Sequence, residues 1–369
     1  MDFGKKALFS ILDLKDAFHQ VLLREDSRPL TCTSTPIGSI QWKVVVMGLK
    51  NGVPIFQRVV DHCLRPVRDV AAGYVDDVLV GTDWAGSWEA TINQHDKDIK
   101  RVLNQFKVCK LVVDKKLKLL VREVEFCGHV LGGGKRRPAP GKLMAVEKWE
   151  PPKTVTQLRG FLGFTNYYSA YIRGYAAIVA PLQDLLKVTK IEGRKGSKAP
   201  VNFQTEHNAA FLEIKSRLLQ GLALHSVKPD QPFVLRVDAS NRAVGAALEQ
   251  FEEKIEGMPT PEQVLSLKRV PVAFCSRKLA PGQVKWTPRE KETYAIITAL
   301  LKWASWINYQ PLLILTDHKS LESWHKELLD TPSGPAGRRY RWHELLFRFD
   351  VHVEYVPGRE NVVADALSR

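Results

Sequence analysis

Cysteine is scarce in this sequence, and no two cysteines form a recognisable pair. A CxxC motif, which marks many zinc sites and redox centres, does not occur. This argues against a zinc knuckle and a disulfide framework, and it fits a reducing compartment inside the cell. Ten histidines do not change the argument, because His62, His95 and His129 lack ligand-like spacing and are expected at the surface or in a core. The cysteines are Cys32, Cys63, Cys109, Cys127 and Cys275.

Long apolar runs are also absent. No segment approaches the roughly 18 residues of a membrane span, and residues 1–14 carry charges where a signal peptide would have an apolar core. Internal repeats and low-complexity tracts are not found. With 369 residues, 44% of them hydrophobic, the chain has enough apolar mass for two or three domains. We therefore expect a globular protein with no membrane partner.

Positive charge is abundant and unevenly distributed. The formal net charge is +14. Residues 1–100 hold 12 Lys and Arg against 13 Asp and Glu, whereas residues 101–150 hold 12 against 5, a net of +7. This concentration favours a polyanionic partner over a solvated basic surface, although the second reading stays open. Lys115, Lys116 and Lys118 are the candidate phosphate contacts, which would set affinity and register but not sequence preference.

The first 200 residues read as a succession of strands and helices. The apolar run 7–14 indicates a buried strand that ends in an acid, and 73–80 (GYVDDVLV) indicates two strands around a tight acidic turn. Thr154, followed three residues later by Gln157, is typical of a capping box. The other expected elements are a helix at 57–64 entered after Pro54, a helix at 88–106, one strand at 124–131, a basic hinge at 135–138, helices at 154–171 and 178–186, and a loop at 188–200.

Residues 233–317 read as strand, strand, strand, helix and strand. This order predicts a compact domain with a helix layered on a sheet. The expected strands lie at 233–239, 243–250, 271–276 and 312–317, the helices at 211–219 and 289–309, and a Pro/Gly loop at 331–337.

Three carboxylates stand at strand ends in the first part of the chain. Asp13 ends one apolar strand, and Asp76 and Asp77 lie in the turn after another. Carboxylates there are costly to bury without a partner, and a metal ion is an efficient one. An isolated Asp-Asp turn is usually a solvated hairpin tip, but the apolar residues on both sides of this one favour buried strands. Nucleotidyl transfer uses two Mg²⁺ roughly 4 Å apart, which three such acids can hold.

The surrounding motifs resemble a known family. FSILDLKDAFHQV, MGLKNGVPIFQ and YVDD occur in the order and spacing of motifs A, B and C of reverse transcriptases. VEFCGHVL and LRGFLGFTNYYSAYI are similar to the primer-grip and thumb segments of gypsy-type LTR retrotransposons. The resemblance covers nearly the whole chain, which is identified as a member of the gypsy-type (Metaviridae) Pol family with its reverse transcriptase and RNase H segments.

The resemblance implies roles for single residues. Asp13, Asp76 and Asp77 match the metal-binding aspartates. Phe18 matches the ring beneath the incoming sugar, which excludes a 2′-hydroxyl, although a plain core Phe stays an open reading. Residues 47–54 read MGLKNGVP where the family usually has FGLTNAP, so the floor of the nucleotide pocket is altered. The other matching residues are Gly48 and Gln57 in the nucleotide pocket and Phe126, Cys127 and Gly128 in the primer grip.

Four acids in the second part match the Asp–Glu–Asp–Asp order of ribonuclease H domains. They are Asp238, Glu292, Asp317 and Asp365, and DASNRAVGAALEQ, TDHKSL and YVPGRENVVADALSR resemble the gypsy-type RNase H around them. Each acid alone is unremarkable, but four together can hold two divalent ions beside a phosphate. We choose Glu292 over Glu290 because Glu292 matches the family's Glu followed by an apolar helix, whereas Glu290 would point about 200° away around the helix.

These observations predict a multidomain fold of the α/β and α+β classes. A right-hand polymerase palm is expected at 1–137, a thumb and linker at 138–200, and an RNase H-like domain with a mixed sheet at 201–369, with its core at 226–369. Because 12 residues precede Asp13, we expect the fingers to be largely missing and primer extension by this chain alone to be weak.

The resemblance implies an RNA-directed DNA polymerase with RNase H activity. Its cofactors would be Mg²⁺ or Mn²⁺, two per active site. Its partners would be an RNA–DNA hybrid, an RNA template, a DNA primer and deoxynucleoside triphosphates, in the cytoplasm, within retroelement particles, or in the nucleus. Two alternatives are a fragment active only as RNase H and a decayed or domesticated copy that only binds nucleic acid. Intact acids at all seven positions argue against the second.

Overall fold

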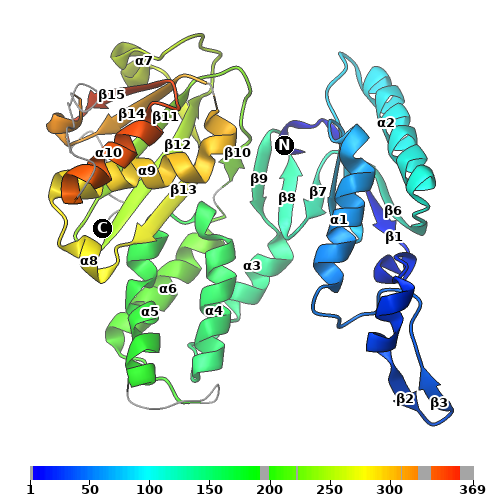
Figure 1. Ribbon diagram of the computed structural model, residues 1–369. Helices are drawn as coiled ribbons and strands as arrows, with labels where there is room; N and C mark the ends of the chain where they lie inside the picture. The colour runs from blue at the N-terminus through cyan, green and yellow to red at the C-terminus, as the bar shows by residue number, and fades with distance from the viewer. Residues whose placement is uncertain (1–2, 192–198, 222, 309, 323–333, 358–369) are drawn as a thin grey trace. The chain divides into compact units, whose positions relative to one another are not determined.

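The computed structural model describes residues 3–191, 199–221, 223–308, 310–322 and 334–357. The chain divides into two compact units, residues 1–136 and 137–369, and each is described by itself (Figure 1). Among these described residues, no helix combines the length and the apolarity that a membrane span needs.

The first unit is built on a four-stranded sheet with the order β4-β5-β1-β6. Its centre is β1, which pairs antiparallel with both β5 and β6. Two helices, α1 and α2, pack on one face of the sheet (Figure 1) through a core that includes Phe56, Val60 and Phe106. The predicted strands at 7–14 and 73–80 and the helix at 88–106 are thereby confirmed. The bounds are β1 (Leu8–Leu14), α1 (Gly52–Leu64), β4 (Ala71–Tyr74), β5 (Asp77–Thr82), α2 (Trp88–Cys109) and β6 (Val113–Val121).

The two faces of this sheet carry different side chains. Leu12 and Val78 belong to the core beneath the helices, whereas Phe9 and Leu79 belong to a second core on the opposite face. Side chains alternate between faces along a strand. Asp13 and Asp77, which pair with each other in the β1–β5 register, therefore lie on the face away from α1 and α2.

A hairpin replaces the single strand predicted at 124–131. β7 (Val124–Phe126) and β8 (His129–Gly132) pair antiparallel, and the two residues between them, Cys127 and Gly128, have φ of 49° and 75°. Two consecutive positive φ angles form the turn that suits a tight hairpin. The strand pattern was wrong because cysteine is not a residue that signals such a turn, whereas the hairpin agrees with the primer-grip resemblance of Phe126, Cys127 and Gly128. The predicted hinge at 135–138 is a strand, β9 (Lys135–Pro138), and the boundary between the two compact units falls within it, after Arg136.

Two predicted boundaries failed for the same reason. α1 begins at Gly52, two residues before Pro54, and α10 (Gly334–Leu346) begins inside the predicted loop at 331–337, with Pro335 in its first turn. Proline fits the first turn of a helix because the N–H it lacks would have no helical partner there. The predicted loop at 188–200 also starts too early, because residues 188–191 belong to the helix α5 (Tyr175–Ile191).

The remaining elements of the first unit are short. β2 (Thr33–Thr35) and β3 (Gly38–Ile40) form a hairpin. The short 3-10 helices are η1 (Phe3–Lys5), η2 (Ala17–Gln20), η3 (Glu25–Thr31) and η4 (Arg65–Val67).

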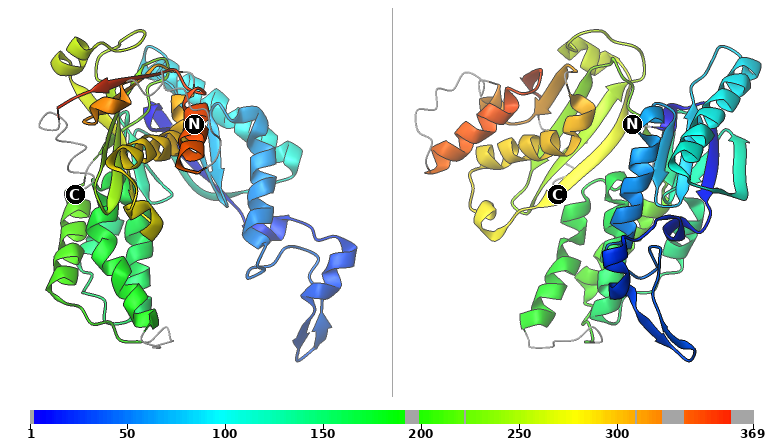
Figure 2. Two further views of the ribbon diagram at one scale, coloured as in Figure 1. Left: turned by 60° about the vertical axis from the view of Figure 1, so that its left-hand side comes forward. Right: turned by 45° about the vertical axis from the view of Figure 1, so that its right-hand side comes forward.

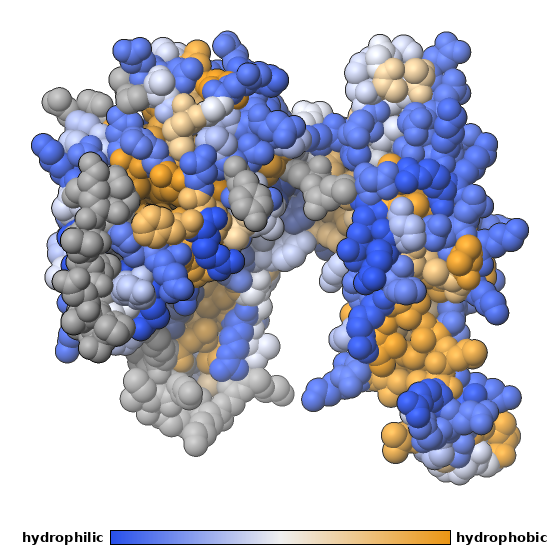
Figure 3. All heavy atoms as spheres, turned by 45° about the horizontal axis from the view of Figure 1, so that its top comes forward, coloured by the Kyte–Doolittle hydropathy of each residue, from blue (hydrophilic) through white to orange (hydrophobic). Residues whose placement is uncertain are grey.

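Large apolar side chains stay exposed in this unit, as Figure 3 shows in orange. Leu103, Leu117 and Leu119 line a cavity of about 490 Å³ between α2 and β6.

The second unit contains a five-stranded mixed sheet with the order β13-β12-β11-β14-β15. The first three strands pair antiparallel, and β14 and β15 add in parallel. α9 covers one face (Figure 2). The predicted order of three strands, a helix and a strand is confirmed. The bounds are β10 (Leu224–His225), β11 (Phe233–Ala239), β12 (Ala243–Phe251), α7 (Pro261–Ser266), β13 (Arg269–Lys278), α8 (Pro281–Val284), α9 (Pro288–Ile307), β14 (Leu312–Thr316), η6 (Lys319–Leu321) and β15 (Val351–Tyr355).

Helices that precede the sheet pack on its other face. Ala247 of β12 and Phe274 of β13 belong to one core with Phe161, Val179 and Phe211 from three of these helices. The predicted thumb segment and the RNase H-like sheet therefore share a core. The capping box predicted at Thr154 is confirmed. The bounds are α3 (Pro140–Glu147), α4 (Val155–Tyr167), η5 (Ser169–Tyr171) and α6 (Thr205–Leu219).

The shared core makes a testable prediction. Phe274 is 1% exposed, so Phe274→Ala should lower the free energy of unfolding of the second unit by about 3–5 kcal/mol. Urea unfolding of the full chain, followed by hydrogen exchange, should show the α5–α6 helices and the sheet losing protection together. Leu212→Ala, which removes a 60% exposed side chain of α6, should change stability little. Destabilisation confined to the sheet would contradict a common core.

Candidate active sites

The palm aspartates meet at the ends of two neighbouring strands. Asp13 near the end of β1 pairs in register with Asp77 at the start of β5, and the amide of Leu14 donates to the Asp76 carbonyl at 2.9 Å. Asp13 is half-buried, and the other two aspartates are exposed. The structure thus brings the three predicted acids together at the strand ends.

Mutual repulsion marks this cluster. Burial raises the pKa of Asp13, and the charges of Asp76 and Asp114 raise it further, while Lys116 acts in the opposite direction. The pKa of Asp77 is also raised, first by burial and then by Asp76 and Asp13. A divalent cation would relieve this repulsion, and carboxylate oxygens are the ligands that Mg²⁺ prefers. No pattern in the sequence indicates that Asp114 and Lys116 are neighbours of Asp13.

The turn that carries the Asp-Asp pair is strained and braced. Val75 has φ of 55°, which is costly for a β-branched residue. The Gln57 amide spans the turn: its Oε1 accepts from the Val75 N–H at 2.8 Å, and its Nε2 donates to the Gly73 carbonyl at 3.1 Å and to Asp61 at 2.9 Å. These contacts make Gln57 a support of the turn, and its contact with a nucleotide stays a prediction.

Gly73 shows why α1 can approach the turn so closely. A Cβ atom at this position would collide with the Val60 side chain of α1. Only glycine therefore lets β4 pack against the helix at the distance that brings Gln57 into reach of the turn.

The other predicted polymerase residues lie around the same sheet. Phe18 packs edge-on against Phe56, with ring centroids 5.5 Å apart. Gly48, with φ of 89°, lies exposed before α1. Phe126 packs against the second core of the palm. Burial raises the pKa of Cys127, and the charge of Asp77 adds to this effect, so the Cys127–Gly128 turn lies near the aspartates.

The three predicted basic residues lie exposed on β6, the strand next to β1. Lys118 pairs with Ile11 in the β1–β6 register, and Ile11 shares its face with Asp13. Lys118 therefore points to the face of the aspartates, and Lys116 lies close enough to Asp13 to lower its pKa. A polyanion on the aspartate face would therefore meet two of the three lysines.

The second cluster is more compact. Carboxylate oxygens of Asp238, Glu292 and Asp317 lie within 4.8 Å of one another. Arg236 of β11 pairs with Leu315 of β14 in the parallel register, so the aspartates two residues further along both strands stand side by side. Glu292 reaches them from α9. Of the predicted acids, Asp365 lies outside the described residues.

The environment of Glu292 fits a cation. It is 5% exposed, its Oε1 accepts from the Ala239 amide at 2.8 Å, and its buried Oε2 has no hydrogen-bond partner. Burial raises its pKa to about 9, with further contributions from Asp238 and Asp317. An all-carboxylate set of hard oxygen donors suits Mg²⁺ or Mn²⁺.

Glu290 has a different task. With Thr287 it forms the capping box at the start of α9, where the Thr287 amide donates to its Oε2 at 3.0 Å, and Arg338 bonds its Oε1 at 2.9 Å. The structure therefore places Glu292, the residue predicted from the resemblance, beside the aspartates, and Glu290 caps the start of the helix.

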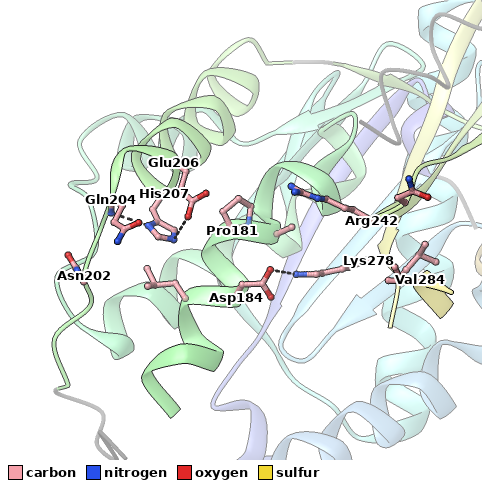
Figure 4. Close-up of a pocket in the computed structure, with 13 residues that line it drawn as sticks. Pro181, Asp184, Asn202, Gln204, Glu206, His207, Arg242, Lys278 and Val284 are labelled. Carbon is pink, nitrogen blue, oxygen red and sulfur yellow. Dashed lines mark hydrogen bonds and ion pairs between the residues drawn. The ribbon is translucent and has the colours of Figure 1, made fainter. Parts of the chain in front are cut away.

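A separate cavity of about 600 Å³ lies between α5, the start of α6 and the β11–β12 loop (Figure 4). Its lining is polar and of mixed charge. Lys278 is bonded to Asp184 at 2.7 Å, while Arg242 is the other cation among the lining residues. None of the three clustered carboxylates lines this cavity, so it is distinct from the candidate metal site.

The raised pKa of Glu292 predicts proton release on metal binding. With a pKa of about 9, this carboxyl is protonated at pH 7 and must ionise to bind a cation. Calorimetric titration with Mn²⁺ in buffers of different ionisation enthalpy should show about one proton released at pH 7 and less as the pH approaches 9. The release should vanish in Glu292→Gln but persist in Glu290→Gln, and equal release from both variants would contradict the assignment.

Comparison with known proteins places this geometry in a family. Residues 2–131 match the family described as reverse transcriptase (RNA-dependent DNA polymerase), and residues 228–349 match the RNase H-like domain found in reverse transcriptase. The chain is 31% identical to the Pol polyprotein from transposon opus of Drosophila melanogaster over 99% of its length. It is 29% identical to that from transposon gypsy over 100%, and 30% identical to the enzymatic polyprotein of cauliflower mosaic virus over 99%.

The chain spans 34%, 33% and 51% of these relatives, respectively. A solved structure of the foamy viral protease-reverse transcriptase in complex with an RNA/DNA hybrid has a similar fold, with a TM-score of 0.74, 21% identity, and coverage of 95% of this chain and 44% of that one. The predicted succession of a polymerase region and an RNase H-like domain is confirmed. The chain carries the reverse transcriptase and RNase H-like segments found in retroelement Pol polyproteins, and it is similar to the opus and gypsy Pol polyproteins over nearly its whole length.

Proposed function

We propose that this chain is an RNA-directed DNA polymerase whose RNase H-like domain cuts the RNA strand of RNA–DNA hybrids. The observation that carries the proposal is the cluster of Asp238, Glu292 and Asp317. Its position inside an RNase H-like domain, in a chain that also opposes Asp13 to Asp77 in a palm sheet, supports two active sites. The foamy viral relative was solved with an RNA/DNA hybrid, which supports the same class of substrate here.

For hybrid cleavage, the clustered acids would hold two Mg²⁺ or Mn²⁺ ions, with Asp365 as the fourth ligand. When bound, such ions supply an activated water and stabilise the charge on the leaving oxygen. Asp238 and Asp317 are fixed by paired strands, and the Ala239 amide orients Glu292 through its Oε1. Because Glu292 must lose its proton to serve as a ligand, activity should rise with pH through the neutral range.

For polymerisation, Asp13, Asp76 and Asp77 would hold the ions that activate the primer 3′-hydroxyl and bind the triphosphate. Gln57 keeps the turn of Asp76 and Asp77 in its strained conformation. Phe18 would exclude a 2′-hydroxyl, with Phe56 as its support. The remaining proposed contacts are Gly48 in the nucleotide pocket and Phe126, Cys127 and Gly128 at the primer end.

The proposed partners follow from these sites. They are an RNA template, a DNA primer, their hybrid and deoxynucleoside triphosphates. Lys115, Lys116 and Lys118 are proposed to contact the phosphate backbone, and the location would be the cytoplasm, retroelement particles or the nucleus.

Single charge removals should separate the two activities. Asp238→Asn should lower hybrid cleavage by about a hundredfold or more, since bound metal ions contribute several kcal/mol to such reactions, and should leave primer extension intact. Asp77→Asn should do the reverse. Both are measured on one labelled hybrid substrate with the full chain.

The matched controls keep the same change of charge elsewhere. Glu290→Gln alters the cap of α9, and Asp83→Asn removes the Lys6 partner beyond the far end of β5. Both should leave the two activities within a few-fold of the parent. Cleavage without extension in the parent would favour an RNase H-only fragment, and binding without either activity would favour a decayed copy.

The basic residues of β6 predict the salt dependence of binding. Each lost phosphate contact should lower the slope of log affinity against log salt by about 0.9 on a B-form duplex. Lys116→Gln and Lys118→Gln should each have this effect, and Lys115→Gln tests whether the third lysine makes such a contact. Lys100→Gln on α2, which breaks a surface ion pair with Asp96, is the control. An unchanged slope in the Lys116 and Lys118 variants would refute the contact.

A further inference from the structure

A polar network is buried in the palm, on the face of the sheet opposite the aspartates. Ser10 of β1 and His95 of α2 are both 0% exposed, and Thr82 of β5 and Asp98 of α2 are both 2% exposed. The proposed chemistry uses none of these groups. Buried polar side chains are expensive unless each is fully paired, and a fully paired network specifies one arrangement of the elements that carry it.

His95 stands at the centre of this network. Its Nε2 lies 2.7 Å from Ser10 Oγ, and its Nδ1 lies 2.7 Å from Thr82 Oγ1. Thr82 Oγ1 donates to Asp98 Oδ2 at 2.7 Å. On the other side, the Leu120 amide of β6 donates to Ser10 Oγ at 3.2 Å. One imidazole therefore joins α2 to β1 and β5, and through Ser10 to β6.

The contacts fix the positions of the protons. Asp98 can only accept, so the Thr82 hydroxyl donates to it and must accept from Nδ1–H of His95. The Ser10 oxygen already accepts from the Leu120 amide, and its single hydrogen points to Nε2. Among the described residues Ser10 has no other side-chain partner. The ring is therefore neutral with its proton on Nδ1, and a second proton on Nε2 would leave the Ser10 hydrogen without an acceptor.

Charged groups around His95 anchor one end of the network. Asp98 also accepts from Gln94 at 3.0 Å and from Arg101 at 3.4 Å. Arg101 in turn binds Asp69 through two nitrogens at 2.9 and 3.1 Å. The strands β1, β5 and β6 present no charged group to the ring. They contact it, directly or through Ser10, with two hydroxyls and an amide. Asp98 and Arg101 are thus held by their own partners, and the connection between α2 and these strands depends on the imidazole.

The network can form in only one register of β1 and β5, the two strands that carry Asp13 and Asp77. Ser10 and Thr82 lie diagonally across the β1–β5 pair, where Ser10 faces Val80 and Leu8 faces Thr82. A slip by one residue would turn one hydroxyl to the opposite face, and a slip by two would move it by about 6.6 Å along the strand. A single imidazole can bond both hydroxyls in only one of these registers.

We propose that His95 is a positioning residue for the palm metal site: its neutral ring bonds Ser10 and Thr82 and thereby holds the register that sets Asp13 opposite Asp77. Ser10 is three residues from Asp13, and Thr82 is five from Asp77, on the far side of the sheet. The inference rests on the proposed polymerase function, because it assigns the aspartates to a metal site. It goes beyond that function by assigning the control of their spacing to α2.

The protonation state can be tested without any activity. In the full chain with ¹⁵N-labelled histidine, the resonances of one ring, assigned by their loss in His95→Leu, should show Nδ1 protonated and Nε2 bare. Because burial lowers the pKa of His95, with Asp98 opposing, the ring should stay neutral at the pH where an ordinary histidine, with a pKa of about 6.5, takes up its second proton. A proton on Nε2, or titration of His95 in that ordinary range, would overturn the network as described.

The positioning role needs variants that remove the imidazole bonds together with their partners. In Ser10→Ala/Thr82→Val/His95→Leu all three side chains become apolar, so both partners of the two imidazole bonds are removed, a change that costs less than leaving one partner unpaired. Asp98 Oδ1 keeps its bonds to Gln94 and Arg101, whereas Asp98 Oδ2 and the Leu120 amide each lose one partner. His62→Leu makes the same replacement on an exposed face of α1. Hydrogen exchange of β1 and β5 reports on folding in each variant.

The decisive measurement is the affinity of the palm for Mn²⁺, followed by electron paramagnetic resonance in a full chain that carries Asp238→Asn and Asp317→Asn. We expect the triple variant to bind about tenfold more weakly, the effect typical of groups that orient metal ligands, and His62→Leu to bind like the parent. Unchanged affinity in a folded triple variant would overturn the positioning role alone. If Asp77→Asn does not reduce the binding of Mn²⁺ relative to the parent, the proposed polymerase site is wrong, and this inference is wrong with it.

Discussion

The antiparallel pairing of β1 with β5 is the constraint on which the polymerase half of the chain depends. Because side chains alternate along each strand, one register decides two things at once. It places Asp13 opposite Asp77 on one face, and on the other it turns Ser10 and Thr82 toward α2. The metal-site candidate and the buried network therefore depend on the same register, and a slip of that register would displace both.

The two carboxylate clusters solve the same electrostatic problem differently. In the palm, two of the three aspartates are exposed, so water screens their repulsion. In the second unit, Glu292 is buried beside two aspartates and its pKa rises to about 9, so a proton lowers the repulsion. A metal ion bound at this second cluster would displace the proton, which would couple metal occupancy to pH.

Much of this architecture could be predicted because it follows from short patterns of residue types along the chain. Apolar runs that end in acids located Asp13, Asp77 and Asp238, and the family pattern together with helix geometry separated Glu292 from Glu290. Contacts between distant segments left no such trace. Nothing in the sequence around His95 signals Ser10, 85 residues away. The residue pattern also did not indicate the Gln57 brace or the Cys127 turn, since each depends on a positive φ, at Val75 and at Cys127, that the residue type does not favour.

The helices α4, α5 and α6 and the RNase H-like sheet share one core, in which Phe274 and Ala247 turn away from α9. This bears on how such elements can evolve. A recombination event that joined a foreign ribonuclease at about residue 226 would receive a sheet with one face uncovered. A crossover at the boundary between the two units, after Arg136, would carry the helices along with the sheet they cover. We expect lineages to have exchanged the helices and the nuclease as one inherited block.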